Sequence, residues 1–187
     1  LSGLCPAGTA EAKVASTTGK EYNSCIKNKA KAKGGVTDVE ACVAADGKGK
    51  IGKATAKTTS DETKNCTSDP PTFGATDAAT VNQLALDKEA ALMAVIFGSD
   101  IDASLALEAA DKDQSKCQQA IAKDLTKCQD TQLKEFNKCK KTVLKAGADT
   151  ALELEACVLD DPAGKIAKKC DLDSGGKVDK IRKDLSG

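Results

Sequence analysis

The sequence predicts an all-α fold in which two disulfide-stapled helical hairpin units, an internal duplication, are joined by a long central helical region. Most of the 187 residues lie in stretches rich in Ala, Lys and Glu, which favour helices. No run alternates apolar and polar residues between turn signals, as a strand would. Nine cysteines offer covalent staples, and two parts of the chain are similar in sequence.

The internal similarity rests on two pairs of segments. KEYNSC (20–25) and KEFNKC (134–139) share four of six residues, and DVEACVAADGKGKIGKA (38–54) aligns with ELEACVLDDPAGKIAKK (153–169). The alignment also matches the cysteines: Cys5 with Cys117, Cys25 with Cys139, Cys42 with Cys157, and Cys66 with Cys170. The chain therefore contains two related units, and Cys128 has no counterpart.

Glycine, proline and capping residues set the predicted boundaries of the elements. The first half predicts helices over about 9–33, ended by Gly34-Gly35; over 38–45, opened by Thr37 or Asp38; and over about 50–66, ended near Pro70-Pro71. The second half predicts helices over about 78–97, opened by Asp77; over about 101–146, opened by Ser99 or Asp100; over about 151–159, opened by Asp149 or Thr150; and over 163–170. Residues 171–187 are expected to form a short helix or a frayed tail.

These elements divide the chain into four parts. They are a first hairpin unit at 1–69, a linker with an apolar central helix at 70–98, a long helix with the second hairpin unit at 99–174, and a C-terminal tail at 175–187.

Three cysteines of the long helix lie on a regular spacing. Cys117, Cys128 and Cys139 are eleven residues apart, and eleven residues turn a helix by about 1100°, about 20° past three turns. The three thiols therefore lie on one stripe about 33 Å long. Such a stripe allows the helix to be stapled along its length to an antiparallel neighbour. The apolar residues near the same face are Ile121, Leu125 and Phe136.

In a helical hairpin, the cysteines nearest the turn are expected to pair first. This predicts Cys139–Cys157 and, by the duplication, Cys25–Cys42. The outer cysteines of the first unit then pair as Cys5–Cys66.

The partner of Cys170 is predicted differently by two arguments. The alignment favours Cys117. Helical rise favours Cys128, because Cys157 to Cys170 rises about 20 Å, Cys139 to Cys128 about 17 Å and Cys139 to Cys117 about 33 Å. We prefer Cys128–Cys170, which leaves Cys117 as the odd cysteine. An odd cysteine predicts an intermolecular disulfide or a free thiol, or else a buried unpaired side chain.

Composition excludes several classes of protein. Lysine plus arginine and aspartate plus glutamate number 28 each, and aromatic residues make up 2%, so neither a net basic surface nor a platform for base stacking is expected, and we predict no nucleic-acid partner. The longest apolar run, AALMAVIFG (90–98), is shorter than the roughly 20 residues that span a bilayer.

The cysteines indicate disulfides, with no metal and no cofactor. The chain has no histidine and no Cys-x-x-Cys pair, which zinc and haem sites commonly use. Widely spaced cysteines in a helical chain are typical of an oxidising compartment. We therefore expect a secreted protein, extracellular or at the cell surface.

Two loops resemble ligand sites incompletely. GKGKIGKA (47–54) is close to a phosphate-binding loop, but Ala54 stands where Ser or Thr would reach the metal. DLDSGGKVD (171–179) is close to a calcium loop, but Arg182 stands where the bidentate glutamate is needed. Polar turns are expected at both, and the pattern selects no catalytic residue.

Three segments together, CQQAIAKDLTKCQ (117–129), LKEFNKCKK (133–141) and LEACV (154–158), resemble a group of uncharacterised, predicted-secreted, cysteine-containing helical proteins of environmental bacteria. The similarity covers about residues 95–170. It implies export and a helical disulfide architecture, and no activity.

These observations predict a non-enzymatic extracellular structural protein that associates with itself, into a filament or a surface assembly. The alternative is a secreted helical carrier of an apolar small molecule or lipid. Its ligand would lie around Leu84, Leu92, Val95, Ile96 and Phe97.

Overall fold

The computed structural model describes residues 7–66, 77–148, 150–158 and 161–171. The regular structure of these residues is all helical, as predicted, and none of them lies in a strand. The elements in chain order are α1 Ala7–Ala30, α2 Val39–Ala45, α3 Lys50–Asn65, α4 Ala78–Phe97, α5 Ile101–Ser104, α6 Lys112–Lys145, α7 Ala151–Glu155, the 3-10 turn η1 Ala156–Val158 and α8 Lys165–Cys170.

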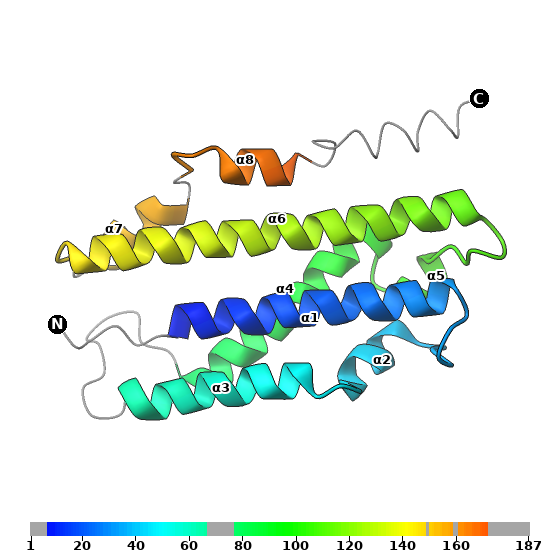
Figure 1. The fold of residues 1–187 in the computed structure, drawn as a ribbon, viewed down its shortest axis with the longest axis horizontal. Helices are drawn as coiled ribbons and strands as arrows, with labels where there is room; N and C mark the ends of the chain where they lie inside the picture. Colours follow the sequence, from blue (N-terminus) through cyan, green and yellow to red (C-terminus); the bar gives the residue numbers. More distant parts are fainter. Residues whose placement is uncertain (1–6, 67–76, 149, 159–160, 172–187) are drawn as a thin grey trace.

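Helix α1 lies between α3 and α6, and both run antiparallel to it (Figure 1). Helix α4 crosses α1 obliquely and also contacts α3 and α6. Helix α8 returns along the side of α6 that faces away from α1 (Figure 1). The first hairpin (α1 to α3) and the second (α6 to α8) therefore pack side by side through α1 and α6. The central helix α4 contacts both α1 and α6.

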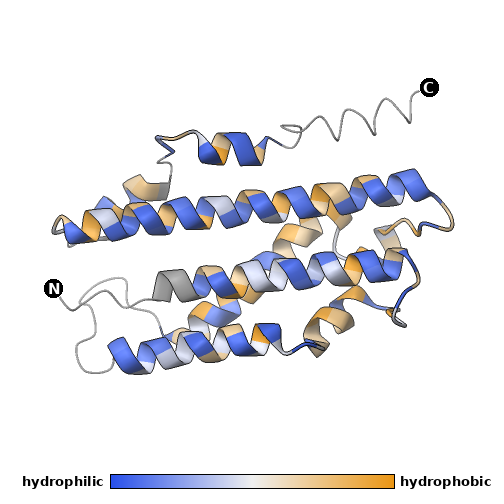
Figure 2. Cartoon of the chain, in the orientation of Figure 1, coloured by the Kyte–Doolittle hydropathy of each residue, from blue (hydrophilic) through white to orange (hydrophobic). Residues whose placement is uncertain are grey.

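The main core forms where α1, α2, α4 and α5 meet. Met93 and Phe97 of α4 pack with Ile26 of α1 and Val39 of α2, and each of the four side chains is 2% exposed or less. Figure 2 shows the contrast between the apolar α2 and α4 and the largely hydrophilic α6. The buried residues of α6 are small or polar: Ser115, Ala122, Thr126 and Glu135. Because burial free energy scales with apolar area, α6 adds little to this core.

Side-chain caps open four of the helices, α2, α4, α5 and α7, at residues that the sequence indicates. Asp38, Asp77 and Asp100 each accept a hydrogen bond from a backbone N–H in the first turn of α2, α4 and α5. Thr150 opens α7 with a capping box, in which Glu153 bonds back to Thr150.

Residues 105–111 contradict the prediction of one continuous helix over 101–146. Helix α5 ends at Ser104, Leu105 is buried, and the Glu108 N–H donates to the Ala30 carbonyl at 2.8 Å. The chain thereby closes over the end of α1. The Asp111 carboxylate then accepts two backbone N–H groups and opens α6. Burial of Leu105 and the Asp111 cap make this break without glycine or proline.

The turns before α3 and α8 are built in the same way. The Asp46 carboxylate accepts the N–H groups of Lys50, Ile51 and Gly52, and the Asp161 carboxylate accepts those of Lys165 and Ala167. Gly49 and Gly164 precede the helices with φ of 62° and 60°, where glycine avoids steric strain. The alignment of the two halves matches these positions, which supports the duplication; the duplication itself stays a prediction.

The described residues contain three disulfides at predicted pairs, Cys25–Cys42, Cys128–Cys170 and Cys139–Cys157, and Cys117 is free. Their Cα–Cα distances of 5.9, 4.6 and 5.5 Å are usual for disulfides. The argument from helical rise therefore found the partner of Cys170, and the alignment did not. Cys5 and most of the predicted tail at 171–187 lie outside the described residues, so Cys5–Cys66 stays a prediction.

Candidate functional site

A buried carboxylate, Glu89, lies where α1, α4 and α6 meet. It belongs to the stripe of α4 on which every fourth residue is buried: Val81, Ala85, Glu89, Met93 and Phe97. The Glu89 side chain is 0% exposed, and neither carboxylate oxygen has a hydrogen-bond partner among the described residues. An unpaired buried charge is costly, so this position disfavours the ionised form.

Gly19 of α1 makes room for Glu89. A Cβ atom at position 19 would lie 2.7 Å from Glu89 Oε2 and 2.7 Å from Thr126 Cγ2. Real contacts do not come so close, so the missing side chain is what allows the three helices to approach one another.

Polar side chains join α1 to α6 beside Glu89. Asn23 Nδ2 donates to Thr126 Oγ1 at 2.9 Å, and Ser16 Oγ donates to Asp130 Oδ2 at 3.0 Å. The buried contact between the two hairpins therefore depends on small and hydrogen-bonded side chains more than on large apolar ones.

Burial raises the pKa of Glu89 to about 8, the nearby Asp130 charge adds to the shift, and the Gln129 amide opposes it. Glu89 is thus mostly protonated at neutral pH. Desolvation is the main cause, as expected for a carboxyl group between packed helices. A neutral acid that titrates near pH 8 is a group through which pH can act on the packing of α1, α4 and α6.

An apolar groove of about 370 Å³ opens between α1, α4 and α6; Glu89 is not among the residues that line it. We call it the leucine groove, since its largest apolar side chains are Leu84, Leu92, Leu125 and Leu133. Glu11, Lys88, Gln129 and Gln132 also line it. A small apolar molecule with a polar end fits this combination of groups.

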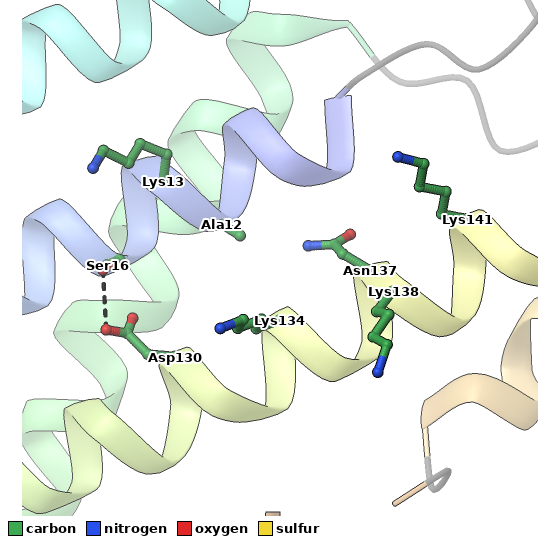
Figure 3. A pocket seen from close by; sticks show the side chains of 8 residues that line it. All are labelled: Ala12, Lys13, Ser16, Asp130, Lys134, Asn137, Lys138 and Lys141. Carbon is green, nitrogen blue, oxygen red and sulfur yellow. Dashed lines mark hydrogen bonds between the residues drawn. The ribbon is translucent and has the colours of Figure 1, made fainter. Parts of the chain in front are cut away.

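A second groove, of about 510 Å³, lies between the N-terminal part of α1 and the C-terminal half of α6. We call it the lysine groove, since Lys13, Lys134, Lys138 and Lys141 line it (Figure 3). Figure 3 shows Asn137 projecting from α6 toward Ala12 of α1, and the Ser16–Asp130 hydrogen bond at one end.

The predicted apolar ligand site at 84–97 is not a single site. Leu84 and Leu92 line the leucine groove, but Phe97 is 2% exposed within the core and Val95 is 79% exposed on the outside of α4. Ile96 packs, partly buried, against the core. The five side chains diverge because consecutive residues of a helix point in different directions.

The odd cysteine, Cys117, is a half-buried free thiol near the start of α6. Cys128 and Cys139, which follow it on the same stripe, are stapled to α8 and to η1. No described segment returns far enough along α6 to pair with Cys117 in the same way.

The segment GKGKIGKA forms the start of α3 and its preceding turn. The backbone N–H groups that a phosphate would need already donate to the Asp46 carboxylate. The prediction of a polar turn is confirmed. The calcium-like segment, after Asp171, lies outside the described residues.

Three acidic side chains, Asp38, Glu40 and Asp102, bring one oxygen each within 4.8 Å of the others. Asp38 caps α2, while Asp102 accepts the Val39 N–H and lies 2.6 Å from Lys29 Nζ. These contacts account for the cluster as part of the α2 start.

Sequence reasoning missed both Glu89 and the lysine groove. Glu89 follows Asp87 and Lys88, and such a charged triplet is typical of a solvated turn of helix. The available signal was its place, four residues from both Ala85 and Met93. The lysines of 134–145 number five against one glutamate, a local excess that the net charge of zero conceals.

None of the described helices has the length and apolar character to cross a membrane. The three disulfides indicate an oxidising environment. Comparison of the chain with family models, with curated proteins and with solved structures gave no match.

Proposed function

We propose that the chain is an extracellular, non-enzymatic structural protein that associates with copies of itself. The observation that carries the proposal is the outer patch of α4, which we define as Ala90, Ala91, Ala94 and Val95, all of them exposed. Val95 alone is 79% exposed.

The outer patch is unusual because the opposite side of the same helix is also apolar. Met93 and Phe97, from the same two turns, lie in the core. A helix that is apolar on all sides is normally covered on all sides. Small side chains also let a second helix approach closely, so a second copy of the chain suits this surface.

A second exposed apolar side chain supports assembly beyond a dimer. Leu152 of α7 is 75% exposed and lies near one end of the long axis, whereas the second half of α4 lies toward the other end (Figure 1). Contact between two different patches is head-to-tail, and such contacts build filaments where the rotation does not close a ring.

The test is sedimentation velocity of the oxidised protein over a range of concentrations, followed by electron microscopy. We expect concentration-dependent assemblies, and Ala91→Glu/Val95→Asp should shift the population to monomer. Ala56→Glu/Ala79→Glu is the matched control, since it adds the same charge at exposed alanines outside the patch. A wild-type protein that stays monomeric throughout would overturn the proposal.

Cys117 offers a different route to self-association, through an intermolecular disulfide. Assemblies that vanish in Cys117→Ser but persist in the α4 variant would assign association to the thiol and remove the outer patch from the proposal. Non-reducing electrophoresis separates the two cases.

The leucine groove favours a second candidate function, a carrier of a small apolar molecule. Organic extraction of the native protein followed by mass spectrometry tests it. A stoichiometric copurified lipid that is lost in Leu92→Gln/Leu125→Gln would support the carrier, and an empty groove in a monomeric or polymeric protein would exclude it.

A further inference from the structure

Four lysines and a single carboxylate, Asp130, line the lysine groove. Lys13, Lys134 and Lys141 form no ion pair with any described residue, and Lys138 lies 3.8 Å from Glu135. Glu135 is shared, because Lys165 of α8 contacts it at 3.3 Å. The one carboxylate of the groove, Asp130, is already bonded to Ser16 and faces Lys20 at 3.9 Å.

The helix dipole accounts for only part of this charge. Cations in the last turn of a helix are stabilised by its C-terminal carbonyl groups, and the effect fades beyond that turn. Helix α6 ends at Lys145, so Lys134 and Lys138 lie well before the last turn. Unpaired lysines there suit an anion that comes from outside the chain.

The arrangement of the lysines indicates an extended anion and not a compact one. Lys134, Lys138 and Lys141 follow one another along α6 at rises of about 6 Å and about 4.5 Å. In Figure 3, Lys13 and Lys138 point in different directions on the two sides of the groove, and Lys141 lies at the end away from the Ser16–Asp130 hydrogen bond. Ammonium groups that diverge do not enclose one phosphate, but they contact successive charges on a chain.

We propose that the lysine groove binds an anionic polysaccharide through carboxylate groups spaced along its chain. A nucleic acid fits less well, because no aromatic side chain lines the groove to stack a base. The choice of a polysaccharide among polyanions rests on the extracellular setting of the proposed function. The inference that the groove binds some polyanion is independent of the extracellular setting and of self-association.

The test measures binding of the soluble oxidised protein to polygalacturonate, with neutral dextran, monomeric galacturonate and single-stranded DNA as comparison probes. We expect polygalacturonate to bind best and to weaken steeply with salt, as counterion release requires. Lys134→Gln/Lys138→Gln/Lys141→Gln should weaken binding about tenfold or more. By analogy with nucleic-acid binding, it should also lower the slope of log affinity against log salt by roughly two to three.

The matched control is Lys33→Gln/Lys53→Gln/Lys123→Gln. These three lysines are exposed, form no ion pair with described residues and carry the same total charge, so this variant should keep the affinity within about twofold. Equal losses in both variants would overturn the site, since charge alone would then explain binding. Tighter binding of DNA than of polygalacturonate would overturn the polysaccharide assignment, and no binding of any polyanion at low salt would overturn the proposal.

Failure here is distinguishable from failure of the proposed function. The α4 variant Ala91→Glu/Val95→Asp lies on a different element and should retain polygalacturonate binding as a monomer. If the protein self-assembles but does not bind polygalacturonate, the proposed structural role stands and the proposed binding site in the lysine groove is refuted.

Discussion

Glu89 makes the stability of the folded chain depend on pH. The pKa of an ordinary glutamate is 4.5, and burial raises that of Glu89 to about 8, so between these values the folded protein binds more protons than the unfolded one. The contribution of Glu89 to stability is therefore fullest below about pH 4.5 and falls as pH rises toward about 8, by at most about 1.4 kcal/mol per unit. Partial solvent access and relaxation reduce this slope.

Glu89→Gln should remove that dependence, since the amide keeps the shape of the side chain and cannot ionise. Urea unfolding measured at several pH values from 5 to 9 checks it, and the variant should be the more stable protein at pH 8. The absence of histidine leaves few other groups to titrate in this window. Glu40→Gln, at an exposed position, should keep the wild-type slope; an unchanged slope in Glu89→Gln would contradict the assignment.

Two glycines within helices should respond oppositely to alanine. At Gly52 the nearest atom to a new Cβ is 3.5 Å away, so Gly52→Ala should stabilise the chain by up to about 1 kcal/mol through helix propensity. At Gly19 the same gain is offset by overpacking of about 1–3 kcal/mol, so we expect a net loss of about 1 kcal/mol. Thermal unfolding followed by circular dichroism measures both.

Adding Thr126→Ser to Gly19→Ala separates the causes of that loss. The change removes Thr126 Cγ2, one of the two atoms at 2.7 Å, and keeps the hydroxyl that Asn23 needs. Stability should partly recover in the double variant. Failure to recover would locate the strain at Glu89 alone.

At the scale of residues, the cysteine pairs were predictable because a disulfide imposes a distance and helical rise converts sequence separation into distance. Glu89 was not, because its burial is a property of the neighbours that pack on α4. Its spacing from Ala85 and Met93 is compatible with a buried stripe, but the adjacent Asp87 and Lys88 indicate a solvated one equally well.

At the scale of elements, α8 depends on its staple more than any longer helix does. None of its described residues is buried, and the Cys128–Cys170 disulfide and the Lys165–Glu135 ion pair tie it to α6. A partly exposed ion pair contributes little. The disulfide therefore holds this helix in place.

Removal of two different disulfides should accordingly have different effects. In Cys128→Ala/Cys170→Ala, we expect rapid hydrogen exchange confined to α8 and little change elsewhere. In Cys25→Ala/Cys42→Ala, packing of the main core should be disturbed, because Cys25 is 1% exposed and packs there. Global stability should therefore drop by about 2–4 kcal/mol. Exchange measured by mass spectrometry distinguishes them, and the reverse pattern would refute this division.

Helix starts were predictable because their caps are local: Asp38, Asp77, Asp100 and Thr150 act within one turn. The break at 105–111 was not, because it depends on a contact between Glu108 and Ala30, residues far apart in sequence. Local patterns do not contain such tertiary contacts.

At the scale of the whole molecule, the class was predictable and the packing of the hairpins was not. Helix-forming composition and paired cysteines predicted stapled helices. The side-by-side contact of α1 with α6 depends on the space at Gly19 and on hydrogen bonds such as Asn23–Thr126. Neither the space at Gly19 nor such a hydrogen bond produces a periodic pattern of apolar residues in the sequence, from which helix packing is normally inferred.

This small-residue architecture predicts that the reduced chain does not stay folded. The Cys25–Cys42 and Cys139–Cys157 disulfides, at about 2–4 kcal/mol each, amount to roughly 4–8 kcal/mol. This is comparable with the whole stability of many domains, about 5–15 kcal/mol. The core offers little to replace them, since aromatic residues are 2% of the chain and α6 buries only small or polar side chains. Full reduction should therefore abolish the cooperative thermal transition seen by circular dichroism. Cys117→Ser, treated with the same reductant, should behave like the wild type, because that thiol closes no loop. A reduced chain that melts cooperatively near the oxidised midpoint would show that packing alone holds the helices together.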